Sequence, residues 1–222
     1  MNRLVTTAGN LLGLFVLGLL CSATLPPAEA WAQTVRAESF GVAVRTATVS
    51  EKAPVAVLPA EGGMASDQSP SVSVSGLAGA QNVFAIASGA TGLGPKHAPE
   101  SSAESNSTLE SVELLGGLIT ADGVVAVAST AITGTVVNSN AEGSQVANLV
   151  VNGVSIGDAV APNTRVNLPG VGYVVLNEQI PTGNGVTTSG ITVNMIHVVL
   201  TNLFGATTGE VIVGSATSSV TQ

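Results

Sequence analysis

The residues that could carry chemistry are few and lie far apart in the sequence. The chain of 222 residues contains one cysteine, Cys21, and two histidines, His97 in "GPKHAPE" and His197 in "TVNMIHVVL". A zinc site in a protein usually takes three or four nitrogen or sulfur ligands, so these residues argue against a zinc centre. His97 stands in a polar stretch, where we expect a solvated loop histidine.

Nucleophilic catalysis would have to use His197 or His97 as its base. A serine or threonine must lie beside that base, and a third group must orient it. The one G-x-S-x-G match, "GVSIG" at residues 153–157, falls in a predicted hairpin and not in the strand-to-helix turn of a nucleophile elbow, so a Ser/His/Asp site built on His197 is the minor alternative. Strict alternation along a strand places His197 on one face with Val193, Met195 and Val199. We therefore expect a packed or edge-strand histidine there.

The carboxylates show no arrangement that predicts a catalytic pair or a metal site. Glu110 and Glu113 are three residues apart, which places them on opposite faces of a regular strand. Asp122 in "TADGV" and Asp158 in "IGDAV" occupy turn positions, where aspartate is favoured for backbone reasons. Neither aspartate lies in a calcium-loop motif. The sequence therefore predicts no catalytic residue, no metal ligand and no cofactor.

One polar and aromatic segment, "GYVVLNEQ", is the candidate for contact with a partner or ligand. Its candidate residues are Tyr173, Asn177, Glu178 and Gln179. Carbohydrate sites commonly stack a sugar on an aromatic ring, and the chain has few aromatic residues besides Tyr173. The alternative is a strand tyrosine that covers the core.

Composition excludes some classes of partner. Only 9% of the residues are charged, six residues are Lys or Arg, and the net charge is −8. Nucleic-acid binding depends on neutralising phosphates with basic side chains, so no nucleic acid is expected as a partner. Attraction to anionic lipid through a polybasic patch is disfavoured for the same reason.

The first 32 residues are typical of an export signal. Arg3 precedes an apolar run from Leu11 to Leu20, two prolines follow, and "AEA" or "AWA" offers a small-x-small cleavage site. A membrane anchor is the alternative, but a span needs about 20 mainly apolar residues. Cys21 follows Leu20 and not the small residue of a lipoprotein signal. We expect cleavage, a secreted or envelope location, and no transmembrane anchor in the mature chain.

Residues 33–222 are predicted to form one all-β domain. Short alternating runs of Val, Ile, Thr and Ser are separated by turn residues, which is typical of an antiparallel β-sandwich. Asn152-Gly153 between "NLVV" and "VSI" predicts a tight hairpin, and Pro169-Gly170 predicts another reversal. A flexible polar loop is expected around residues 89–107. A β-barrel and a β-solenoid are the alternative folds, although no fixed repeat is present.

The order of several segments resembles that in the bacterial choice-of-anchor P family. These segments are "SVELLGGLITADGVVAVAST", "LVVNGVSI", "APNTRVNLPGVGYVVLNEQ", "ITVNMIHVVL" and "GEVIVGSATSSV". The resemblance implies an exported surface protein and brings no activity, cofactor or catalytic residue with it. We expect a non-enzymatic structural or interaction protein that associates with itself, another envelope protein or a glycan. The alternatives are a ligand-binding β-domain and an atypical secreted hydrolase.

Overall fold

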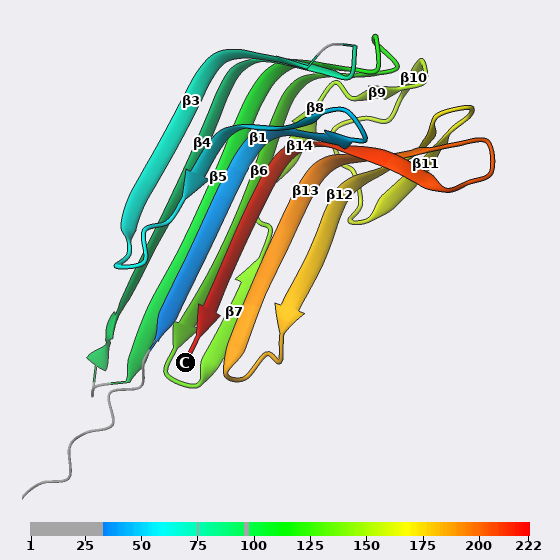
Figure 1. The fold of residues 1–222 in the computed structure, drawn as a ribbon. Coiled ribbons are helices and arrows are strands. Elements are labelled where there is room, and N and C mark those ends of the chain that lie inside the picture. The colour runs from blue at the N-terminus through cyan, green and yellow to red at the C-terminus, as the bar shows by residue number, and fades with distance from the viewer. Residues whose placement is uncertain (1–32, 75, 96–97) are drawn as a thin grey trace, which may run out of the picture. The chain divides into compact units, whose positions relative to one another are not determined.

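The computed structural model describes residues 33–222 except residues 75 and 96–97 (Figure 1). The predicted export signal (1–32), Cys21 and His97 lie outside the described residues. Within the described part of the chain there are fourteen β-strands and no α-helix, which confirms the prediction of an all-β fold.

The strands form two antiparallel sheets that pack face to face. Sheet A contains, in spatial order, β11 (Thr164–Leu168), β12 (Gly172–Gly183), β13 (Thr188–Thr201), β14 (Thr207–Thr221), β1 (Thr34–Thr46) and β2 (Ser50–Val57). Sheet B contains β10 (Val154–Ser155), β9 (Val150–Val151), β6 (Ile119–Thr133), β5 (Pro99–Leu114), β4 (Ala78–Leu93) and β3 (Gly63–Val74). Two further strands, β7 (Val136–Asn140) and β8 (Gln145–Ala147), pair with β6. Both sheets end in edge strands, so the architecture is the predicted sandwich.

Chain order explains how the sandwich closes. Strands β1 and β2 begin sheet A, β3 to β6 form a meander in sheet B, and β11 to β14 return to sheet A. The last strand, β14, then pairs with the first, β1, from Thr34↔Thr221 to Thr46↔Gly209. The first and last described strands are therefore central neighbours in one sheet.

The two predicted hairpin turns are present where the sequence placed them, whereas Asp122, also expected at a turn, lies within β6. Asn152 and Gly153 have φ values of 51° and 75° and connect β9 to β10, as a hairpin turn with two positive φ angles requires. The Pro169-Gly170 reversal connects β11 to β12, and Val171 N–H donates to the Leu168 carbonyl at 3.0 Å.

The polar segment 89–107 is mostly strand, so the expectation of a flexible loop there was wrong. Strand β4 continues to Leu93 and β5 begins at Pro99, which leaves only residues 94–98 as the connection. Alternate residues of β5 from Ser101 to Ser107 are buried, although most of them are serines. Small hydroxyl side chains fit between closely packed sheets. The prediction of a loop relied on the polarity of the segment and did not allow for buried serines.

Two regions of the interior have different chemistry. The larger core is made of Val, Leu, Ile and Ala, with Leu109, Ile119 and Leu176 fully buried. The smaller core contains Ala85, Ala87 and Ala103. Buried hydroxyls link the two sheets in this second region. These bonds join Ser39 Oγ to the Ile86 carbonyl at 2.9 Å, Ser105 Oγ to the Thr217 carbonyl at 2.9 Å, and Thr130 Oγ1 to Ser218 Oγ at 2.8 Å.

All the long strands of sheet A bend along one line. Pairing skips one residue in each neighbouring strand: Asn177 in β12, Met195 in β13, Gly214 in β14, Gly41 in β1 and Pro54 in β2. In sheet B, Asn82 in β4 and Ser111 in β5 have positive φ at the matching irregularity. In sheet A each skipped residue lies opposite a skipped residue of the neighbouring strand, so the register is the same on both sides of the bend and no strand has an extra residue. Because these positions are aligned, the strands turn together (Figure 1).

Candidate functional site

The candidate site lies on the outer face of sheet A, at the bend. The pairing of β13 skips Met195, and the buried face changes between Met195 and Ile196, which are both in the core. Met195 and Val193 point into the core, whereas Asn194 and His197 lie on the outer face. The prediction that His197 shares a face with Val193 and Met195 was therefore wrong, although Val199 does follow His197 on the outer face. A bend of this kind, which leaves the register unchanged, has no strong sequence signal.

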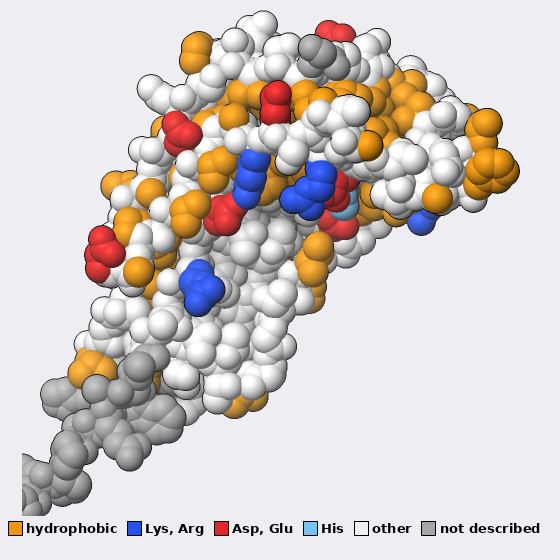
Figure 2. Space-filling model, in the orientation of Figure 1, with side chains coloured by type: hydrophobic (Ala, Val, Ile, Leu, Met, Phe, Trp, Pro, Cys, Tyr) orange, Lys and Arg blue, Asp and Glu red, His pale blue; other side chains and the backbone are white. Residues whose placement is uncertain are grey.

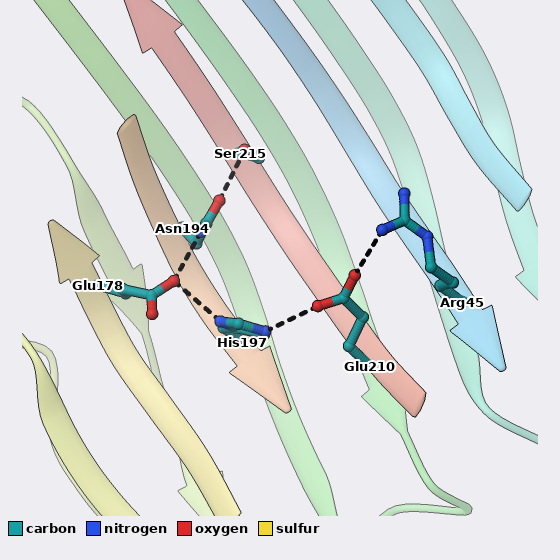
Figure 3. Close-up of polar contacts among 6 residues, drawn as sticks. All are labelled: Arg45, Glu178, Asn194, His197, Glu210 and Ser215. Carbon is teal, nitrogen blue, oxygen red and sulfur yellow. Dashed lines mark hydrogen bonds and ion pairs between the residues drawn. The ribbon is translucent and has the colours of Figure 1, made fainter. Parts of the chain in front are cut away.

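Four strands each contribute to a continuous row of polar side chains, the elbow cluster (Figure 3). The elbow cluster consists of Arg45 from β1, Glu178 from β12, Asn194 and His197 from β13, and Glu210 and Ser215 from β14.

Glu178 is the centre of one half of the elbow cluster. Its Oε2 atom lies 2.9 Å from Nδ1 of His197 and accepts a hydrogen bond from Nδ2 of Asn194 at 2.7 Å. Asn194 Oδ1 in turn accepts a hydrogen bond of 2.7 Å from Ser215 Oγ. The Ser215 hydroxyl is buried and committed to an amide, so it does not pair with the imidazole.

Glu210 is the centre of the other half. Its Oε2 atom lies 3.4 Å from Nε2 of His197, which is an ion-pair distance without hydrogen-bond geometry. Its Oε1 atom lies 3.2 Å from Arg45 NH1. The His197 side chain is 16% exposed, whereas Arg45 is 77% exposed. The row therefore runs from a largely buried histidine to a solvated arginine.

The electrostatics favour a charged histidine. The hydrogen bond to Glu178 raises the pKa of His197, while burial opposes this and the charges of Glu178 and Glu210 add to it. The hydrogen bond to His197 lowers the pKa of Glu178 against the effect of burial, with help from Asn194. A neutral imidazole would direct a lone pair at one of the two carboxylates, so protonation removes a repulsion.

The elbow cluster lacks the geometry of a nucleophilic site. A general base must be within hydrogen-bond reach of the proton that it takes, and the partners of His197 are two carboxylates. Among the described residues, no group of three His, Cys, Asp or Glu side chains is placed to hold a metal ion. The arrangement holds four strands together by charge and hydrogen bonds.

A hollow of about 320 Å³ opens beside the cluster, between β1, β2 and the start of β14. Phe40, Arg45, Lys52 and Glu210 are among its lining residues. Lys52 Nζ lies 4.3 Å from the centroid of the Phe40 ring and also pairs with Glu38. Figure 2 shows basic and acidic side chains close together on this face, above a broad surface without charged side chains.

The four residues predicted to contact a ligand do not form one site. Tyr173 lies under the Arg165 guanidinium, at 3.6 Å from ring centroid to Cζ. Asn177 has a positive φ of 47°, and its Nδ2 donates to the Val160 carbonyl at 2.9 Å. Gln179 N–H donates to Asn163 Oδ1 at 2.9 Å, so Asn177 and Gln179 fasten the loop before β11. Only Glu178 belongs to the elbow cluster.

The other carboxylates that the sequence singled out also have structural partners. Asp122 Oδ2 and Asp158 Oδ1 both accept hydrogen bonds from Asn148, at 2.7 and 2.9 Å, so they hold a turn. Glu110 and Glu113 are both exposed on the same side of β5, because Ser111 between them has a positive φ of 49°. The expectation of opposite faces was wrong for the same reason as at His197.

Comparisons with known proteins add no relative. No family model, curated protein or solved structure matches the chain. In the described part of the chain, no helix is long and apolar enough to cross a membrane.

Proposed function

We propose that this protein is an exported, non-enzymatic component of the bacterial envelope or extracellular matrix that acts by structure and by contact with partners. The observation that carries the proposal is the elbow cluster, in which the largely buried histidine lies between two carboxylates and the nearby serine is bonded to an amide. These groups stabilise a bent sheet and are not left free for catalysis. The resemblance to the choice-of-anchor P family, the apolar N-terminal run and the low charge support an exported surface protein.

Self-association through a sheet edge is the mode of contact that the fold supports best. Strand β3 is twelve residues long, lies at the edge of sheet B and has mostly exposed side chains. Asp67 Oδ2 of β3 accepts the Val55 N–H of β2 at 3.0 Å, which protects one point of the neighbouring edge. Unpaired edge groups are a template for another strand.

Light scattering of residues 33–222 across concentration, with and without calcium, tests this mode. We expect growth into oligomers, and we expect the edge variant Ser73→Lys to reduce it. Ser102→Lys is the matched control, because Ser102 is also exposed but lies on the central strand β5. A monomer at all concentrations would exclude self-assembly.

Binding of a small ligand or glycan is the second candidate, and the hollow beside the elbow cluster favours it. Its mixed charges and the Phe40 ring suit a polar ligand with one flat face. Chemical-shift mapping against a panel of neutral and anionic oligosaccharides would test this candidate. Shifts confined to Phe40, Lys52 and Glu210 would support it, and an unchanged spectrum would remove it.

A secreted hydrolase of atypical type is the third candidate function. It would require Ser215 to leave Asn194 and reach His197. Hydrolysis of ester or glycoside substrates that Ser215→Ala abolishes, with folding retained, would establish it against our proposal.

A further inference from the structure

The two most exposed large apolar side chains of the described protein are adjacent. Leu203 is 97% exposed and Phe204 is 95% exposed, at the turn between β13 and β14. This hairpin extends at one end of sheet A (Figure 1), and apolar side chains protrude at that end of the surface (Figure 2). An isolated exposed leucine needs no explanation, but two large neighbours at the tip of a projecting turn do.

The turn that presents them is held by its own hydrogen bonds. Asn202 Oδ1 accepts the N–H groups of Phe204 and Ala206 at 2.9 and 3.0 Å. Asn202 N–H donates to the Ala206 carbonyl, and Gly205 N–H donates to the Asn202 carbonyl, both at 2.9 Å. These backbone groups keep their partners when water is removed, so burying the tip leaves few polar groups unsatisfied.

The turns beside the tip carry no charge. Thr201 N–H donates to the Val171 carbonyl at 2.8 Å, which places the Pro169–Val171 turn beside the tip hairpin. On the other side, Thr46 pairs with Gly209, so the turn 47–49 also lies at this end. None of residues 47–49, 169–171 and 201–208 is Asp, Glu, Lys or Arg. The turns at this end of sheet A therefore form an uncharged rim around the apolar tip.

Two kinds of partner could bury the Leu203 and Phe204 side chains, a protein pocket or a lipid surface. A specific protein interface buries about 800 Å² on each partner with shape complementarity. A projecting turn with two large side chains among small residues offers much less area. A fluid lipid surface needs no complementary shape, and it tolerates an uncharged rim. The backbone groups of the turn are already hydrogen-bonded within the turn, so they can enter lipid, where no water is available to bond them.

We propose that the Leu203–Phe204 tip inserts into the outer part of a lipid membrane and holds the protein there reversibly. The inference rests on the proposed extracellular role, which brings the protein to a membrane surface. Because the chain has six basic residues and a net charge of −8, the tip prefers zwitterionic to anionic lipid. Two side chains give a marginal anchor, comparable to one acyl chain with an association constant of about 10⁴ M⁻¹.

Flotation with phosphatidylcholine vesicles tests the insertion. The protein for the test is residues 33–222, since residues 32–222 form one compact unit and the apolar run of Leu11 to Leu20 would itself bind lipid. We expect the wild type to float and the double variant Leu203→Ser/Phe204→Ser to partition about 100-fold less. Leu93→Ser is the matched control, because Leu93 is 67% exposed at another hairpin, and we expect it to float like the wild type.

A fluorescence probe at the tip gives an independent reading. The sole tryptophan of the chain is Trp31, so Phe204→Trp introduces one reporter into residues 33–222. We expect its emission to shift to the blue with phosphatidylcholine vesicles and less with phosphatidylglycerol vesicles.

Three results would overturn the inference. They are a wild type that stays with the buffer, a double variant that floats equally well, and flotation with phosphatidylglycerol alone. Light scattering without lipid separates this test from that of the proposed function. Loss of oligomers in the double variant without lipid would assign the tip to a second copy of the chain instead. Oligomers that persist in a double variant unable to float leave both proposals standing.

Discussion

His197 is the residue whose environment departs furthest from sequence expectation. It has a carboxylate near each ring nitrogen and is mostly buried. The His197 imidazole binds a proton more tightly here than it would in water, because the imidazolium interacts favourably with both carboxylates. Glu178 was singled out as a polar contact residue, but its partner lies nineteen positions away. No pattern within one strand connects the two.

Protonation of His197 should therefore stabilise the fold. Since the pKa of His197 is raised in the folded state, its contribution is complete below the unfolded value of about 6.5 and is lost as the pH rises through the folded pKa. Glu178 acts oppositely, because its lowered pKa gives a contribution that is lost only at acidic pH. The pair is fully effective between the unfolded pKa values of the carboxyl and the imidazole, from about pH 4.5 to 6.5.

The variant His197→Gln measures this contribution. We expect it to lower the free energy of unfolding by about 1–2 kcal/mol at pH 6, and by less at pH 9. Urea unfolding at the two pH values, with Arg45→Gln as the solvated control, provides the measurement. An equal loss at both pH values would mean that packing and not charge is responsible.

The sequence predicted that the elements are strands and where two hairpins turn, but it did not predict where the strands bend. Alternation predicted the all-β class, and Asn152-Gly153 and Pro169-Gly170 marked two hairpins correctly. The skipped positions at the bend were not predicted, since Asn177, Met195 and Gly214 have no common residue type. At each of them the face of the strand that is buried changes. The same effect explains the wrong faces at His197 and at Glu113.

Gly214 shows why a small residue is needed at the bend. Its φ is +65°, and a Cβ atom there would lie 2.6 Å from Val124 Cγ1 of the opposite sheet. We expect Gly214→Ala to lower the free energy of unfolding by about 3–5 kcal/mol, from strain in the backbone and overpacking in the core.

Gly116→Ala is the matched control for that variant. Gly116 has the same φ of +65° but nothing within 4 Å of a Cβ atom, so we expect a loss of only about 1–2 kcal/mol. Thermal or urea unfolding of both variants separates the backbone cost from the packing cost. Equal losses of free energy of unfolding would show that Val124 can move away from the new Cβ atom without destabilising the protein.

At the scale of the whole molecule, composition concealed the second core. A stretch rich in serine and glutamate was expected to be a loop, yet Ser101, Ser105 and Ser107 are buried between the sheets. Ser105 Oγ donates to the Thr217 carbonyl of the opposite sheet and Ser101 Oγ to the Gln33 side chain, so small hydroxyl groups take the place of larger apolar groups there. Buried serines have the same polarity as the serines of exposed loops, so polarity alone does not predict this interior.

The pairing of β1 with β14 predicts tolerance to circular permutation. Thr34 and Thr221 are paired, and paired Cα atoms of antiparallel strands are about 5 Å apart, so a short Gly/Ser linker can join residues 222 and 33. With new termini at the exposed turn Gly116–Gly117, we expect a cooperative fold that loses about 2 kcal/mol, or roughly 4–8 °C in Tm.

New termini between Val213 and Gly214 are the contrasting design, because they interrupt a central strand in the larger core. We expect that permutant to remain unfolded by circular dichroism. If both permutants unfold, the order of the strands along the chain matters more than their arrangement in space.

The central position of β14 also determines when this protein can fold. Strand β1 precedes the other described strands in the chain, but its long partner begins only at Thr207. Contacts between such distant segments must overcome loop-closure entropy before they form, which slows folding. Until β14 has been synthesised, β1 lacks its long neighbour and exposes an unpaired edge. Sheet A can therefore be completed only after β14 has been made.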